Sequence, residues 1–366
     1  MWHKPRKLFA NLALLLGSIA LTLVVCEFVV FRFIFLPSDV PRNVFRDGLI
    51  RYVPGQSGVW RVNDEISAPY AINAEGWNSS RRVYRPERTP GLSRIVIIGD
   101  SYVEAFQVPV TMSLAEQLEH SLPSTEVYRV AISGAPLSQY LLMLEREGVR
   151  YAPDLVVIVL MQNDFDESFR FMHGRYISSF LKLRLGEGRV IEEVQPSRYQ
   201  AGPWEWLRFS ATSRYLYYRR QIAKALSRFR WSAQEAGSNF QANIDTKAVL
   251  EVETDVALAT DYLFGRLAAV ANAHKFALLL VMDGDRHAIY RGIDSAALYK
   301  SGALALNTLA SRAAERHGIP FIDLHPRFEQ DWLKHRRRFD FESENHWNQY
   351  GHAIASAAIE QFVKHE

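Results

Sequence analysis

Residues 94–101 constrain the fold most, because a short apolar run ends there at a glycine and is followed by Ser101. Residues 95–98 are all apolar and β-branched and are too few for a typical helix, so they predict a buried strand of a parallel sheet. Leucines spaced four residues apart at residues 114–122 predict the helix that follows. We therefore expect Ser101 at the ligand-binding edge of an open α/β sheet, although Gly-Asp-Ser is also ordinary turn chemistry.

Four further apolar runs repeat the alternation of strand and helix. They lie at residues 126–132, 154–161, 276–282 and 320–324. Successive units of strand, loop and helix favour right-handed crossovers and a parallel sheet. The sequence thus predicts one α/β domain in which helices flank a five-stranded parallel sheet, and the last helix begins near Asn348.

Residues 1–37 predict a membrane anchor. A basic cluster at residues 3–7 precedes an apolar stretch at residues 8–26, which is long enough to span a bilayer. Glu27 and Arg32 interrupt a further apolar tail whose phenylalanines suit the interfacial zone. Because positive charge marks the cytoplasmic side, we expect the chain after about residue 37 to lie in the periplasm or outside the cell.

The anchor is expected to be retained. No Ala-x-Ala cleavage site follows the apolar stretch, which favours a single-pass signal anchor in the cytoplasmic membrane over a cleaved signal peptide. A lipoprotein processing site at Cys26 is disfavoured, because Val25 stands where a small residue is required.

Two segments depart from the regular pattern. Residues 38–93 are rich in turn formers and predict an irregular lead-in to the main domain, which covers residues 94–366. Within that domain, a basic and aromatic segment at about residues 165–245 predicts an insertion. A helix over residues 213–229 would be amphipathic, with its charges on an anionic membrane surface, on a polysaccharide, or simply in solvent.

Composition and spacing argue against several classes of function. The formal net charge of +3 gives no reason to expect a nucleic-acid partner. The single cysteine, Cys26, excludes an intramolecular disulfide and a cysteine-based zinc site. The histidines outside the C-terminal motif lack the spacing of metal ligands, and Asp164 and Asp166 are interpreted as turn formers. We predict no metal and no cofactor.

Three predicted strands end in loops that carry candidate catalytic groups. Ser101 follows the first strand, Gly134 the second and Asn163 the third, so all three should reach the same edge of the sheet. A serine nucleophile needs a base to take its proton and donors where the oxyanion forms. His346, in a polar loop before the last helix, is the candidate base. The backbone N–H groups of Ser101 and Gly134 and the side-chain amide of Asn163 are candidate oxyanion donors.

Together these motifs resemble the four sequence blocks of the SGNH (GDSL-type) hydrolase superfamily. The blocks are Gly99-Asp100-Ser101, Gly134 after a strand, Asn163-Asp164, and a C-terminal His346-Trp-Asn-x-x-Gly-His, and the match covers about residues 94–360. The resemblance implies a flavodoxin-like three-layer sandwich in which Ser101 attacks, His346 acts as base and acid, and Gly134 and Asn163 complete the oxyanion hole. The lead-in sequence at residues 73–77 is similar to that of membrane-anchored bacterial members.

The acid that orients the histidine departs from the common pattern of this family. An aspartate usually stands three residues before the histidine, where this chain has Ser343. A His-Trp variant, seen in exopolysaccharide O-acetyltransferase and acetylesterase relatives, places the acid two residues before the histidine, which implies Glu344 here. Glu342, Asp340, or a dyad supported by a backbone carbonyl stay open.

The resemblance implies a membrane-anchored serine ester hydrolase or O-acyltransferase that works through an acyl-Ser101 intermediate. The expected substrate is an acylated carbohydrate, such as an O-acetylated envelope or exported polysaccharide, and envelope or polysaccharide-export proteins are the partner class it suggests. Two alternatives remain: an esterase for lipids or small esters, and a carbohydrate-binding domain without catalysis.

Overall fold

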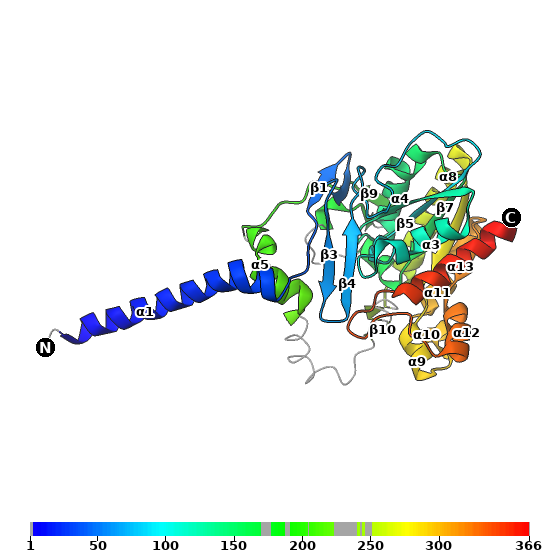
Figure 1. Cartoon of the computed structure of the whole chain (residues 1–366). Helices are drawn as coiled ribbons and strands as arrows, with labels where there is room; N and C mark the ends of the chain where they lie inside the picture. Colours follow the sequence, from blue (N-terminus) through cyan, green and yellow to red (C-terminus); the bar gives the residue numbers. More distant parts are fainter. Residues whose placement is uncertain are drawn as a thin grey trace.

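The structure of the chain is a computed structural model (Figure 1). It describes residues 3–169, 177–186, 191–203, 205–222, 240–241, 244–245 and 251–365. Parts of the insertion predicted at about residues 165–245 lie outside these residues.

A five-stranded parallel sheet forms the centre of the main domain. Its strands are β5 (Ser93–Gly99), β6 (Thr125–Ala131), β7 (Leu155–Leu160), β12 (Ala277–Met282) and β13 (Phe321–Asp323). They lie in the order β13-β12-β7-β5-β6, and every pair of neighbours is parallel. Counted along the chain, this is the order 2-1-3-4-5 of flavodoxin-like sheets. The predicted fold class and its five strands are confirmed.

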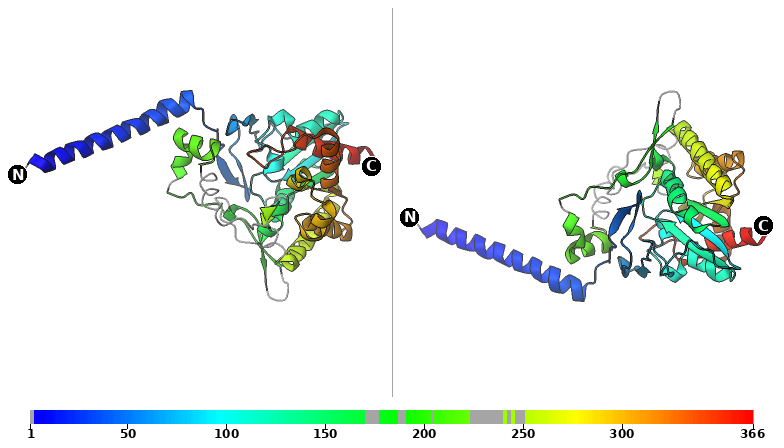
Figure 2. Two further views of the ribbon diagram at one scale, coloured as in Figure 1. Left: turned by 90° about the horizontal axis from the view of Figure 1, so that it is seen from below. Right: turned by 90° about the horizontal axis from the view of Figure 1, so that it is seen from above.

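Helices cover both faces of the sheet, because alternate residues of each strand point to opposite sides. Val96 and Ile98 belong to the core beneath α4 (Leu137–Arg146), α8 (Glu253–His274) and α11 (Ala305–Arg316). Ile95 and Ile97 belong to the core beneath α3 (Leu114–Ser121), α12 (His325–His335) and α13 (Gln349–His365). The result is a three-layer sandwich whose two helical layers are visible in Figures 1 and 2.

Shorter elements complete the described part of the main domain. They are α2 (Ser101–Glu104), α9 (Arg286–Arg291), α10 (Ser295–Ser301), and the antiparallel pairs β8 (Lys182–Leu185) with β9 (Ile191–Val194) and β10 (Phe240–Gln241) with β11 (Ile244–Asp245).

The predicted helix at residues 213–229 is wrong in its extent. α5 (Ala211–Ser213) continues as a π-helical turn, Arg214–Arg219, and Gln221 then adopts a φ of 48°, which ends the helix. Residues 223–229 lie outside the described part.

The lead-in is more regular than expected, so the prediction of irregular structure is wrong over two antiparallel hairpins. These pair β1 (Asn43–Arg46) with β2 (Leu49–Tyr52), and β3 (Ser57–Val62) with β4 (Ile66–Ala71). Asp47 and Gly48, which join the first pair, both have positive φ, as a two-residue hairpin turn requires. Some of the turn formers that suggested irregularity are therefore hairpin turns.

A buried ion pair fastens the lead-in to the main domain. The Arg51 guanidinium of β2 lies 3.0 Å from the carboxylate of Glu147 at the end of α4, and both side chains are buried. Trp77 also donates its indole N–H to Glu147, over 3.3 Å. Asn73 shapes the turn that presents Trp77 by accepting the Trp77 backbone N–H.

We expect Arg51→Met to lower the free energy of unfolding by about 3 kcal/mol, because the buried Glu147 carboxylate would keep only the half-exposed Arg150 as a cationic partner. The double variant Arg51→Met/Glu147→Leu removes both charges and should lose less. Urea unfolding of the full chain in detergent measures both. A larger loss in the double variant than in Arg51→Met would contradict this account.

The N-terminal residues form a long helix that projects from the main domain in every view (Figures 1 and 2). It consists of α1 (His3–Val25) and a π-helical continuation, Cys26–Ile34. Its part from Lys7 to Ile34 is 28 residues long, apolar enough to cross a membrane, and not buried by the rest of the chain. This agrees with the predicted span in position and length.

Candidate active site

Ser101 lies where strand β5 turns into helix α2. The Asp100 side chain caps this helix by accepting the backbone N–H of Tyr102 at 2.9 Å. The helix makes a single turn and ends at Ala105, whose φ is 59°. This tight connection holds the Ser101 hydroxyl at the carboxyl end of a central strand.

His346 comes from the loop before α13 and meets Ser101 across the edge of the sheet. Its Nε2 lies 2.7 Å from the Ser101 Oγ, and its Nδ1 lies 2.6 Å from Oε1 of Glu344. With the proton on Nδ1, the imidazole donates to Glu344 and accepts the Ser101 hydroxyl proton. The structure thus joins the three residues in one hydrogen-bonded chain, although Ser101 and His346 are 245 positions apart in the sequence.

Neither of the other two candidate acids contacts His346. Asp340 is buried and accepts from Arg338 and from the Tyr290 hydroxyl, while the Glu342 side chain is exposed. The second carboxylate oxygen of Glu344 accepts the side-chain amide of Gln221 at 3.2 Å. An insertion residue therefore helps to orient the carboxylate that contacts His346.

The loop that carries His346 is fixed by residues that the sequence analysis missed. Buried Arg286 donates to the backbone carbonyl of Asn345 at 2.7 Å and to the Tyr102 hydroxyl at 3.1 Å. Asp283 pairs with Arg286 and accepts the Trp347 indole N–H at 3.0 Å. A sequence signal existed, because Asp283 directly follows strand β12 and so belongs to the same sheet edge as Ser101.

Gly134 and Asn163 follow the strands on either side of β5. β6 pairs with β5 up to Gly99–Ala131, and β7 pairs with it up to Ile98–Ile158, so the loops after all three strands leave the same edge. Gly134 has a φ of 76°, a conformation that suits glycine. The Asn163 amide donates to Glu167 at 3.3 Å. These positions are compatible with the predicted oxyanion hole.

Glu104, at the end of α2, holds the loop that precedes Gly134. Its fully buried carboxyl group accepts the Ser133 backbone N–H at 3.0 Å, contacts the Ser133 hydroxyl, and accepts the Tyr52 hydroxyl at 2.5 Å. Burial raises the pKa of Glu104 to about 7. One carboxyl group therefore links the Ser101 helix, the Gly134 loop and the lead-in.

This raised pKa predicts a pH dependence of stability. Between about pH 4.5 and 7 the folded chain holds a proton on Glu104 that the unfolded chain has lost, so stability is full below that window and falls as the pH rises through it. We expect Glu104→Gln to reduce this fall by about 3 kcal/mol, whereas Glu87→Gln, at an exposed position, should leave it unchanged. Urea unfolding at about pH 4.5 and about pH 7 measures the change in the free energy of unfolding. An equal change for wild type and Glu104→Gln would contradict a raised pKa of Glu104.

Other conspicuous polar residues have structural roles. His352 is buried, accepts the Leu114 backbone N–H at 3.3 Å, and has its pKa lowered by burial to about 3. Asp164 is buried and accepts the Tyr140 hydroxyl and the Met161 backbone N–H, as a loop-forming residue does. Among the described residues, no group of three His, Cys, Asp or Glu side chains is arranged to hold a metal ion. His173 lies outside the described residues.

Comparison with known proteins gives similar folds only. No family model and no curated protein matches the chain. Similar solved structures include an acetyl xylan esterase, with 13% identity and a TM-score of 0.40 over 74% of this chain and 99% of that one. A lipase/acylhydrolase from Enterococcus faecalis has 13% identity and a TM-score of 0.39 over 75% and 96%. A lipolytic protein of the G-D-S-L family from Veillonella parvula has 14% identity and a TM-score of 0.38, over 74% of this chain and 98% of that one. At these values none assigns a family or an activity, and the chemistry rests on the geometry around Ser101.

Proposed function

We propose that the chain is a serine ester hydrolase or acyltransferase of the SGNH type. The observation that carries this proposal is the hydrogen-bonded chain from Ser101 through His346 to Glu344. A serine, a histidine and a carboxylate in this order provide a nucleophile, its base, and the group that orients the base.

The proposed reaction has two acyl transfers. The Ser101 Oγ attacks the ester carbonyl while its proton passes to Nε2 of His346, and Glu344 stabilises the imidazolium that forms. The carbonyl oxygen becomes an oxyanion, for which the Ser101 and Gly134 backbone N–H groups and the Asn163 amide are the proposed donors. The alcohol leaves with the proton from His346, which yields acyl-Ser101. Water or a sugar hydroxyl then attacks the acyl carbon and gives its proton to His346. His346 returns this proton to the Ser101 oxygen as the bond between that oxygen and the acyl carbon breaks.

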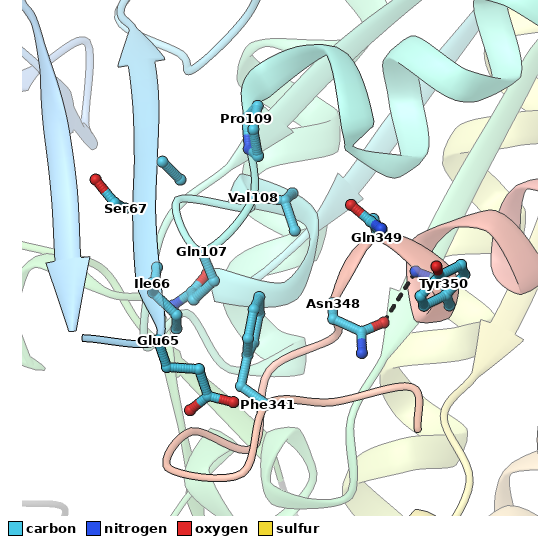
Figure 3. A pocket seen from close by; sticks show the side chains of 11 residues that line it. Glu65, Ile66, Ser67, Gln107, Val108, Pro109, Phe341, Asn348, Gln349 and Tyr350 are labelled. Carbon is cyan, nitrogen blue, oxygen red and sulfur yellow. Dashed lines mark hydrogen bonds between the residues drawn. The ribbon is translucent and has the colours of Figure 1, made fainter. Parts of the chain in front are cut away.

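A carbohydrate substrate is supported by a pocket of about 290 Å³ that Phe341 and Asn348, on either side of His346 in the chain, help to line. Ser101, His346 and Glu344 are not among its lining residues, so the pocket would hold a part of the substrate away from the ester. Side chains from β4, from the loop after α2 and from the start of α13 face it (Figure 3). Its lining combines the polar side chain of Gln107 with the aromatic rings of Phe341 and Tyr350. The Glu65 carboxylate and the Asn348 amide also line the pocket and already form hydrogen bonds within the protein. Hydrogen-bonding groups beside aromatic faces suit the hydroxyls and the apolar ring faces of a sugar.

The proposed location is the outer side of the cytoplasmic membrane. The apolar helix Lys7–Ile34 provides one span, and the basic residues before it favour a cytoplasmic N-terminus. Envelope or polysaccharide-export proteins are the partner class that this location suggests.

The function is tested by the kinetics of ester hydrolysis by the full chain in detergent. With p-nitrophenyl acetate we expect an initial burst close to one p-nitrophenol per chain, followed by slower turnover, as an acyl-enzyme requires. Rates should fall as the acyl chain is lengthened to butyrate and palmitate if acetylated glycans are the substrates. A preference for palmitate would favour the lipid esterase, and absence of any turnover would favour a carbohydrate-binding domain.

A further inference from the structure

The end of the apolar helix is held by a second segment of the chain, residues 205–221, which we call the docking segment. It contains a 3-10 helix (Glu205–Phe209), α5 and the π-helical turn Arg214–Arg219. The Glu27 carboxylate accepts the Ser210 hydroxyl at 2.7 Å and the backbone N–H groups of Ala211 and Thr212 at 2.8 and 3.0 Å. The Phe31 ring stacks on Tyr215 at 4.6 Å. The docking segment is therefore joined directly to the helix.

The position of Glu27 along the helix determines how deep in a bilayer its contact with the docking segment would lie. Twenty residues separate Lys7 from Glu27, and at about 1.5 Å per residue they span about 30 Å. That length equals the hydrocarbon thickness of a typical bilayer. When Lys7 lies at one interface, Glu27 and the docking segment lie at the other. The three donors of the docking segment, together with the Arg32 guanidinium at 3.7 Å, then satisfy the Glu27 carboxylate at the edge of the hydrocarbon.

The docking segment exposes apolar and aromatic side chains beside the helix. Trp206 is 62% exposed and Tyr217 is 60% exposed. Leu207, Phe209 and Leu216 are also exposed. Tryptophan and tyrosine are the residues most enriched where a bilayer meets water. α5 lies beside the end of α1 (Figure 1), and Tyr215, which stacks on Phe31 of the helix, directly precedes Leu216 and Tyr217 in the chain.

The basic residues of the docking segment are engaged within the protein. Arg214 pairs with Asp39 at 3.0 Å. Arg219 and Arg220 both pair with Asp64, at 3.1 and 2.9 Å. Arg208 donates to the backbone carbonyl of Pro41 at 3.2 Å. Because Arg208 and Arg214 bond within the protein and Arg219 and Arg220 share one carboxylate, we assign the contact with lipid to the exposed aromatic and aliphatic side chains.

We propose that the docking segment lies in the interface of the bilayer that the apolar helix crosses, with Trp206 and Tyr217 inserted at the level of the lipid headgroups. This rests on the proposed membrane span and not on catalysis. It places the active site close to the membrane, because Gln221, which contacts Glu344, is four residues from Tyr217, a distance of at most about 14 Å. A substrate presented at the membrane surface fits this arrangement best.

The proposal is tested with single labels on the full chain in vesicles of phosphatidylcholine. In a Cys26→Ser background, Trp206→Cys and Tyr217→Cys each carry a fluorophore, and Leu333→Cys serves as the matched control. Leu333 is 63% exposed on α12, far from α5 in both figures of the whole chain. Quenching is then measured with lipids that carry a nitroxide near the headgroup and with a water-soluble quencher.

We expect lipid-borne nitroxide to quench the labels at residues 206 and 217 several-fold more than the label at residue 333, equally with and without added phosphatidylglycerol. Labels at 206 and 217 that are quenched only from water would overturn the proposal. Shielding from water without quenching by lipid would also overturn it, because another protein surface would then cover the patch. Dependence on phosphatidylglycerol would contradict the aromatic mode of insertion.

Discussion

Ser101→Ala is expected to lower kcat for p-nitrophenyl acetate by about 10⁴-fold or more, because it removes the atom that forms the acyl bond. The substitution deletes only the Oγ, whose bonds to His346 and Asp100 lie within the site, so thermal unfolding should change little. Initial rates and the burst amplitude of the full chain in detergent measure the effect.

The matched control for this variant is Ser93→Ala. Ser93 is the first residue of the same strand, β5, and is exposed at the opposite end of the sheet. It should keep the wild-type rate within about twofold, as surface substitutions usually do. Activity of Ser101→Ala within tenfold of wild type would show that another group carries the reaction.

Glu344→Gln is expected to lower kcat by about 10²–10⁴-fold with a smaller effect on KM. The amide can still accept a hydrogen bond, but it can also donate one, which favours the tautomer with the proton on Nε2, where His346 can no longer accept from Ser101. It also removes the charge that stabilises the imidazolium. The steady-state kinetics of the variant measure both constants.

Glu342→Gln is the control for this prediction, because the Glu342 side chain is two residues away, exposed, and without contact to His346. It should retain near-normal activity. If Glu342→Gln lost as much activity as Glu344→Gln, or if Glu344→Gln were fully active, the hydrogen bond between Glu344 and His346 would have no catalytic role.

The sequence predicts the parts of this fold that depend on local pattern. Each strand of the sheet is an apolar run bounded by turn residues. The pattern at residues 95–98, and at the other four apolar runs, is therefore enough to predict a strand. Ser101 could be selected because it follows a strand of a parallel sheet, and His346 because it stands in a polar loop before the last helix. The hydrogen bonds among Ser101, His346 and Glu344 agree with the roles proposed for them and leave those roles to experiment.

Contacts between distant segments could not be predicted in this way. Arg286 and Asp283 hold the His346 loop, and Gln221 contacts Glu344 from the insertion. The position of Asp283 after a strand places it at the edge of the sheet, but no sequence pattern identifies the partners of these three residues. Glu27 looked like an interruption of an apolar tail, and only the fold shows that α5 satisfies it. The hairpins of the lead-in escape prediction for another reason, since the residue types that form their turns are equally typical of irregular structure.

An activated serine nucleophile reacts covalently with a fluorophosphonate probe, so this probe shows whether Ser101 is one. The full chain in detergent is treated with the probe, digested, and the labelled peptide is identified by mass spectrometry. We expect one label per chain, on Ser101. The label should be absent from Ser101→Ala and present in Ser93→Ala. An unlabelled wild-type Ser101, or a label carried by a different residue, would contradict it.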